Sequence, residues 1–78
     1  MSNLEKYKKI FKECFSVNED VVEELHYQGV AEWDSVGHMD LVATIEDEFD
    51  VMLETDEIIG LDSFLKGMEM LKNHGIEF

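Results

Sequence analysis

The sequence predicts an all-α fold, a small four-helix bundle of three main helices and one short helix, in a single domain of residues 1–78. Three separate stretches carry apolar residues at steps of three and four, which places them on one face of a helix. No stretch alternates apolar and polar residues as a half-buried strand would. Five phenylalanines and one tryptophan suffice for a folded core, but a chain this short permits only one thin core.

The first helix is predicted over residues 3–15. Its apolar side chains follow the helical repeat, and its lysines lie largely between them. Cys14 belongs to the apolar set, so we interpret it as a small core residue rather than a reactive thiol. Because it is the only cysteine, no disulfide within the chain is possible. The apolar set comprises Leu4, Tyr7, Ile10, Phe11, Cys14 and Phe15.

Residues 16–34 predict a long connecting loop with room for one short helical turn. Its apolar residues are scattered rather than periodic, and we expect Val21, Val22, Leu25 and Tyr27 to anchor it. Structureless loops of this length are uncommon in small domains and are often functional. This loop leads directly to Ser35.

The second main helix is predicted over residues 35–49. Its buried face is expected to comprise Leu41, Val42, Ile45 and Phe49.

The start of this helix has two candidate caps. Asp34 or Ser35 can serve as N-cap, and an acid at a helix start suits the positive end of the helix dipole. Gly37 in the first turn weakens the helix slightly.

A short helix follows. We expect Thr55 to cap it, Ile58 and Ile59 to point inward, and Gly60 to end it.

The final helix is expected to begin after Asp62 as its cap and to stop at Gly75, with Ile76 packing just beyond. Its predicted buried face comprises Phe64, Leu65, Met68 and Leu71.

The charge of the chain is strongly negative, with a formal net charge of -13. Residues 13–65 hold sixteen of the nineteen acids and no lysine or arginine. Such a surface repels nucleic acids and anionic membranes and favours basic protein partners, although acidity also serves solubility alone. With no signal peptide and no apolar span long enough for a bilayer, a cytoplasmic monomer is expected.

The helix that begins at Ser35 carries the most informative motif. A single serine stands between Asp34 and Val36 at the start of an acidic helix that ends in Glu-Asp-Glu-Phe. A lysine-bearing helix and a long loop precede it, and a short helix and a second Asp-Ser pair follow. In this order and spacing the chain resembles acyl and peptidyl carrier proteins over nearly its whole length.

The resemblance implies a four-helix bundle of acyl-carrier type with 4'-phosphopantetheine attached to Ser35, and Asp34 beside it. Such a carrier holds an acyl or aminoacyl group as a thioester on this arm and presents it to biosynthetic enzymes. It is a cosubstrate and not an enzyme, since the modifying transferase supplies Mg²⁺ and activates the hydroxyl. The helix start also suits a phosphodiester, because free backbone N–H groups favour negative charge there.

The resemblance also implies a recognition surface on this helix. Val36 and Met39 would make apolar contacts, and Asp40, Glu46 and Asp47 charged ones. The expected partners are a phosphopantetheinyl transferase, an acyl- or aminoacyl-loading ligase, and downstream synthases or transferases with basic docking surfaces.

The chain departs in two places from the usual carrier pattern, and both departures bear on the pathway. Trp33 stands before the Asp-Ser pair and Gly37 and His38 follow Val36, where fatty-acid carriers have small residues before the pair and leucine and an acid after it. The proline usual before the third helix is also missing, with Thr55 in its neighbourhood. These features look more like carriers of specialised aminoacyl, polyketide or cell-surface polymer routes.

Alternatives remain open at this point. Ser35 could be a helix cap only, in an unmodified acidic helical module that binds or inhibits a partner. No EF-hand loop is present, and His38 one turn after Ser35 is a weak catalytic signal without an orienting acid. We therefore expect His38 at the surface, where it could touch partners, and interpret His26 and His74 as isolated residues.

Overall fold

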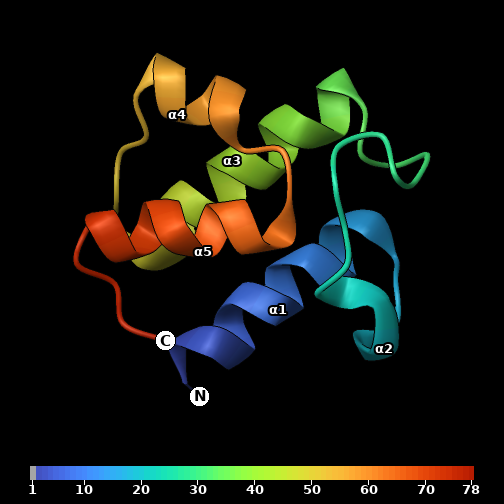
Figure 1. Cartoon of the computed structure of the whole chain (residues 1–78), viewed down its shortest axis with the longest axis horizontal. Coiled ribbons are helices and arrows are strands. Elements are labelled where there is room, and N and C mark those ends of the chain that lie inside the picture. The colour runs from blue at the N-terminus through green and yellow to red at the C-terminus, as the bar shows by residue number, and fades with distance from the viewer. Residues whose placement is uncertain (1) are drawn as a thin grey trace.

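The computed structural model describes residues 2–78, and over these residues the chain is helical with no strand, which confirms the all-α prediction. The helices lie side by side around one core (Figure 1), and the radius of gyration is 11.3 Å. In chain order they are α1 (Asn3–Phe15), α2 (Glu19–Val22), α3 (Ser35–Phe49), α4 (Thr55–Gly60) and α5 (Phe64–Asn73).

Helices α1 and α3 have the bounds that the hydrophobic repeat predicts. Both end at a polar residue in the left-handed conformation, Ser16 with φ 53° and Asp50 with φ 52°. A left-handed residue turns the chain away and lets its own N–H bond a carbonyl of the last turn. In α1 this bond runs from Ser16 to Lys12, and in α3 from Asp50 to Glu46.

The long loop between α1 and α3 contains the short helix α2 and is tied to the segment between α4 and α5. The backbone N–H of Tyr27 donates to the Asp62 carbonyl at 2.8 Å, and that of Phe64 donates to the Leu25 carbonyl at 2.9 Å. Val22 and Leu25 are buried anchors as expected. Val21 is exposed and anchors nothing, because α2 turns it outward.

Helix α4 differs in detail from the prediction. Its N-cap is Glu54 and not Thr55, which is already the first helical residue. The Glu57 carboxylate accepts the Glu54 backbone N–H at 3.1 Å, a reciprocal contact that favours this earlier start. Ile58 is half-buried, but Ile59 is 75% exposed, so the prediction that both point inward was wrong for Ile59.

Helix α5 is capped by Ser63 and not by Asp62, because the Ser63 hydroxyl accepts the Lys66 backbone N–H at 3.0 Å. The buried face is correspondingly rotated from the predicted one. Leu65 is exposed, whereas Met70 is buried. The face comprises Phe64, Gly67, Met70 and Leu71.

Gly75 ends α5 as predicted. It has φ 87°, a conformation that favours glycine. Its N–H donates to the Lys72 carbonyl and the N–H of Ile76 donates to the Leu71 carbonyl, each at 3.0 Å. These two bonds form a Schellman motif, which satisfies carbonyls of the last turn.

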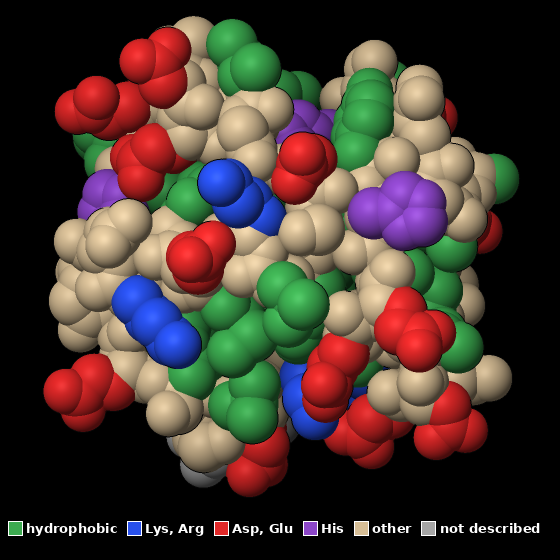
Figure 2. Space-filling model, in the orientation of Figure 1, with side chains coloured by type: hydrophobic (Ala, Val, Ile, Leu, Met, Phe, Trp, Pro, Cys, Tyr) green, Lys and Arg blue, Asp and Glu red, His purple; other side chains and the backbone are tan. Residues whose placement is uncertain are grey.

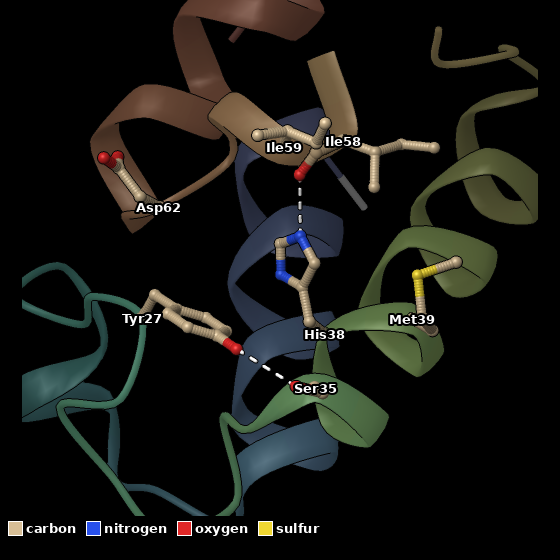
Figure 3. Close-up of a pocket in the computed structure, with 7 residues that line it drawn as sticks. All are labelled: Tyr27, Ser35, His38, Met39, Ile58, Ile59 and Asp62. Atoms are coloured by element: carbon tan, nitrogen blue, oxygen red, sulfur yellow. Dashed lines mark hydrogen bonds between the residues drawn. The ribbon is translucent and has the colours of Figure 1, made fainter. Parts of the chain in front are cut away.

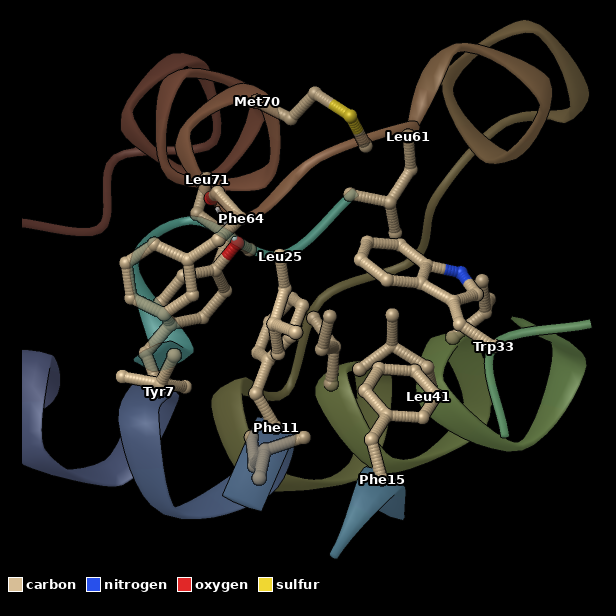
Figure 4. Packing of buried hydrophobic residues seen from close by; sticks show 14 of the residues in the cluster. Tyr7, Phe11, Phe15, Leu25, Trp33, Leu41, Leu61, Phe64, Met70 and Leu71 are labelled. Carbon is tan, nitrogen blue, oxygen red and sulfur yellow. Dashed lines mark hydrogen bonds between the residues drawn. The ribbon is translucent and has the colours of Figure 1, made fainter. Parts of the chain in front are cut away.

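The core gathers the aromatic residues of α1, the loop and α5 (Figure 4). The Tyr7 hydroxyl donates to the Phe64 carbonyl at 2.6 Å, and burial raises the pKa of this phenol. Trp33, whose burial no pattern in the sequence predicts, is 0% exposed and stacks on Phe15 with 4.9 Å between ring centres. Cys14 is half-buried against the core, and burial raises the pKa of its thiol, in agreement with a structural role.

Helix α4 has no fully buried residue, so polar contacts matter for its attachment. His74, just after α5, contacts the Glu57 carboxylate through Nε2 at 2.8 Å. Two hydrogen bonds lower the pKa of Glu57, first that from the Glu54 backbone N–H and then that from His74. The sequence indicates that His74 is an isolated residue, but in the structure His74 joins α5 to α4.

This contact predicts a pH-dependent loss of stability in Glu57→Gln. Because the pKa of Glu57 is lowered by folding, the carboxylate stabilises the fold above the ordinary glutamate pKa. That stabilisation is lost as the pH falls through the lowered value. We expect the variant to lose about 0.5 kcal/mol of unfolding free energy at neutral pH. It should match the parent at a pH below both values.

Urea unfolding at the two pH values measures this difference. Glu69→Gln, which removes an exposed acid from α5, is the control and should change little at either pH. An equal loss at both pH values would contradict the assignment.

Candidate functional site

Ser35 is the first residue of α3, and its side chain is exposed where the long loop meets the helix. Asp34 is the N-cap, with extended backbone, and its carboxylate accepts the Gly37 backbone N–H at 2.9 Å. Of the two candidate caps, Asp34 is therefore the residue that caps α3. Because Asp34 caps the helix, the Ser35 hydroxyl is not needed for capping and faces solvent at the positive end of α3.

The chain contains a second Asp-Ser pair, and the structure uses it differently. At α5 the serine, Ser63, is the cap, and its half-buried hydroxyl is bonded to the Lys66 N–H. At α3 the cap lies one residue earlier, on Asp34. The same dipeptide thus gives an exposed hydroxyl at Ser35 and a structural one at Ser63.

Gly37 allows the loop to pass close to the first turn of α3. A Cβ atom at this position would collide with the backbone carbonyl oxygen of Glu32. The sequence indicated only that Gly37 weakens the helix. The structure shows that its missing side chain makes room for the loop that ends at Ser35.

Tyr27 reaches the site from the long loop. Its hydroxyl lies 3.4 Å from the Ser35 Oγ, within weak hydrogen-bond reach. Its ring meets the His38 ring edge-on, with 5.5 Å between centres. The sequence predicts Tyr27 only as an anchor of the loop, because the contact with Ser35 joins residues that no short motif relates.

His38 is half-buried and not a free surface residue, which corrects the prediction from sequence. Its Nδ1 accepts the indole N–H of Trp33 at 3.0 Å, and its Nε2 lies 2.7 Å from the Ile58 carbonyl oxygen. The imidazole therefore links the loop before Ser35, helix α3 and helix α4. We call these two contacts the His38 bridge. With both nitrogens engaged, His38 is not placed to act as a base for Ser35.

An open cleft of about 450 Å³ lies between Ser35, the long loop and α4 (Figure 3). Its volume falls in the range of small-molecule sites in proteins. Met39 and the two isoleucines of α4 supply apolar walls, and His38 stands between them and Tyr27. The lining residues are Tyr27, Ser35, His38, Met39, Ile58, Ile59 and Asp62.

The residues predicted to face partners are mostly accessible. Val36 is 80% and Met39 is 55% exposed, and Asp40 and Asp47 are exposed as well. Glu46 is half-buried, and its carboxylate accepts the Leu53 backbone N–H at 2.9 Å. Glu46 thus has a structural task in the turn after α3.

The acidic character seen in the sequence is carried by the surface. Figure 2 shows acidic side chains gathered over α4 and over α2 on one face of the molecule. Within residues 2–78, no three histidine, cysteine, aspartate or glutamate side chains come together as a metal site would require. None of the helices in this part of the chain is long and apolar enough to cross a membrane.

No family model, curated protein or solved structure matches this chain. The functional interpretation therefore depends on the site itself, on the exposed Ser35 hydroxyl, the helix start and the neighbouring cleft.

The fit of Gly37 predicts that Gly37→Ala destabilises the domain, although alanine is the better helix former. Intrinsic propensity alone would stabilise the helix by about 1 kcal/mol. The collision with the Glu32 carbonyl should reverse the sign and cost about 1–3 kcal/mol. Urea unfolding followed by Trp33 fluorescence measures the effect.

Gly60→Ala is the matched control, because a Cβ atom there meets nothing within 4 Å. We expect it to be neutral or slightly stabilising. Two glycine variants of equal stability would show that the loop does not need the space at Gly37.

Proposed function

We propose that this chain is a carrier domain of the acyl and peptidyl carrier type, with the four-helix bundle of that class. In this proposal Ser35 bears 4'-phosphopantetheine, and the domain presents an acyl or aminoacyl group to biosynthetic enzymes. The observation that carries the proposal is the exposed Ser35 hydroxyl at the start of α3, which does not cap the helix because Asp34 does.

The residues at the site fit such a group. An exposed hydroxyl is the attachment atom, and the start of α3 favours the negative charge of a phosphodiester. Beside it, Tyr27 offers a hydroxyl and Met39 and Ile59 offer apolar surface to the rest of the arm. When bound, the group supplies a thiol that holds the cargo as a thioester.

The chain itself supplies position rather than catalysis. Asp34 and Gly37 fix the first turn of α3, and Tyr27 lies close to the Ser35 oxygen. His38 is engaged by Trp33 and by α4, so the proton of the Ser35 hydroxyl would leave to a base on the modifying enzyme. This division of roles supports a cosubstrate and not an enzyme.

The acidic surface supports partners with basic grooves. Negative charge around α3 would guide a phosphopantetheinyl transferase, a loading ligase and later synthases or transferases to Ser35. Exposed Val36 and Met39 would add apolar contact in a helix-in-groove arrangement. We place this work in the cytoplasm, with the carrier acting as a monomer.

Incubation with coenzyme A, Mg²⁺ and a broad-specificity phosphopantetheinyl transferase should add the mass of a single arm to the intact protein. The serine oxygen would form the new bond to phosphorus, and 3',5'-adenosine diphosphate would leave. Ser35→Ala should abolish the mass gain. Ser63→Ala is the matched control and should retain it, because the Ser63 hydroxyl is a helix cap.

A chain that gains no mass under these conditions would instead support the unmodified acidic interaction or inhibitor module, which would account for the net charge of -13 equally well.

Charge reversal on α3 should slow this loading through weaker attraction. We expect Asp40→Lys to lower kcat/KM of the transferase about tenfold at low salt, with the difference shrinking as salt is added. Asp40 is a better position for this test than Glu46, because the Glu46 carboxylate also accepts the Leu53 backbone N–H. Glu69→Lys, on α5, makes the same charge change on another helix and should have a smaller effect.

Measurement of initial rates over a salt series decides this point. Equal rates for the parent and Asp40→Lys at low salt would rule out attraction through this part of α3.

A further inference from the structure

The His38 bridge joins three segments that surround Ser35. The indole N–H of Trp33 donates to His38 Nδ1 at 3.0 Å, and the planes of the two rings are within 16° of parallel. On its other side, His38 Nε2 donates to the Ile58 carbonyl at 2.7 Å. Trp33 lies two residues before Ser35 and His38 lies three residues after it, so the bridge spans the attachment site.

Only one protonation state of the imidazole makes both bonds. Nδ1 must carry a lone pair for the Trp33 N–H, and Nε2 must carry the proton for the Ile58 carbonyl. A second proton, on Nδ1, would set one N–H against another. The indole of Trp33 is 0% exposed, so its N–H would lose its acceptor without gaining water.

Helix α4 depends on such contacts more than the longer helices do. It has no fully buried residue, and Ile59 points into solvent. Its polar attachments include the His38 bridge at Ile58 and the His74 contact at Glu57. Loss of the bridge would leave α4 held at Glu57 and by the half-buried side of Ile58.

We propose that His38 is a positioning residue whose neutral imidazole holds the Trp33 loop and helix α4 against α3 and so presents Ser35 for modification. Protonation of His38 releases the loop from α3. This role rests on the proposed carrier function. It differs from that function in making the presentation of Ser35 depend on a hydrogen bond to a buried tryptophan.

The surroundings of His38 contain few other titratable groups. Tyr27, from the long loop, and Asp62, from the segment after α4, line the same cleft. Asp34 caps the preceding turn, where it accepts the Gly37 N–H. On α4 itself, Glu57 contacts His74 and not His38.

Two substitutions test the two contacts of the His38 bridge separately. His38→Asn places an amide oxygen near the position of Nδ1 and keeps an acceptor for Trp33. His38→Gln places an amide N–H near the position of Nε2 and keeps the contact to Ile58. Neither side chain titrates, and both are neutral.

The first measurement follows the indole N–H signal of Trp33 by ¹⁵N NMR, which is unambiguous because the chain has one tryptophan. In the parent we expect slow hydrogen exchange at pH 7.5 and a loss of protection when acidification places a second proton on the imidazole. His38→Asn should stay protected across this range. His38→Gln should lack protection throughout.

His26 and His74 are present in the parent and in both variants, so they cannot produce this difference. If the parent indole signal is independent of the protonation of His38, the bridge is absent in solution and the proposal is wrong.

The second measurement is loading of Ser35 at pH 7.5, with kcat and KM determined separately for the protein substrate. We expect His38→Ala to raise KM about tenfold with kcat little changed, because fewer molecules present the site correctly. His38→Asn should recover most of the loss, since it keeps the loop attached. Equal KM values for the parent and all three variants would overturn the positioning role even if the indole titrates.

A parent protein that is not modified at all would overturn the carrier function and the positioning role together. That failure can be distinguished from a failure of the His38 bridge alone, because the indole measurement is made without the transferase. If His38→Ala does not fold, the asparagine and glutamine variants still decide the outcome by their difference in KM.

Discussion

Burial of the Trp33 indole fixes the position of Ser35, because only Asp34 separates the two residues in the chain. The indole packs on Phe15 and Phe11 of α1 and is bonded through its N–H to His38 of α3. Full burial of such a side chain contributes about 2–3 kcal/mol or more. The loop is thereby tied to the core immediately before the exposed hydroxyl.

The site combines rigid surroundings with an exposed centre. Asp34 and Gly37 define the first turn of α3, and the His38 bridge links that turn to α4. Ser35 itself is solvent-exposed at this fixed turn. This arrangement suits a residue on which another protein performs the chemistry, since accuracy of placement matters more there than the reactivity of the side chain.

The helices could be predicted from sequence because each hydrophobic repeat is a local property. The bounds of α1 and α3 follow from such repeats and from polar residues at their ends. Helix α4 has too few turns to fix a face from its sequence, and Ile59 is exposed although the sequence predicts it inward. In α5 the buried face is rotated from the predicted one, so Leu65 is exposed as well. Contacts between distant residues leave no local pattern at all. His38 meets Ile58 twenty residues further on, and neither that bond nor the burial of Trp33 was predictable from spacing.

The two Asp-Ser pairs show how a shift of one residue in a helix start changes what a hydroxyl can do. The aspartate takes the capping role at α3, and the serine takes it at α5. A search for modification sites that matches only the dipeptide would treat Ser35 and Ser63 alike, although the second hydroxyl is occupied within its own helix. Such searches gain discrimination when they ask which residue of the pair accepts the first-turn amide. In protein engineering, an attachment point would be transplanted together with its capping frame and not as a two-letter motif.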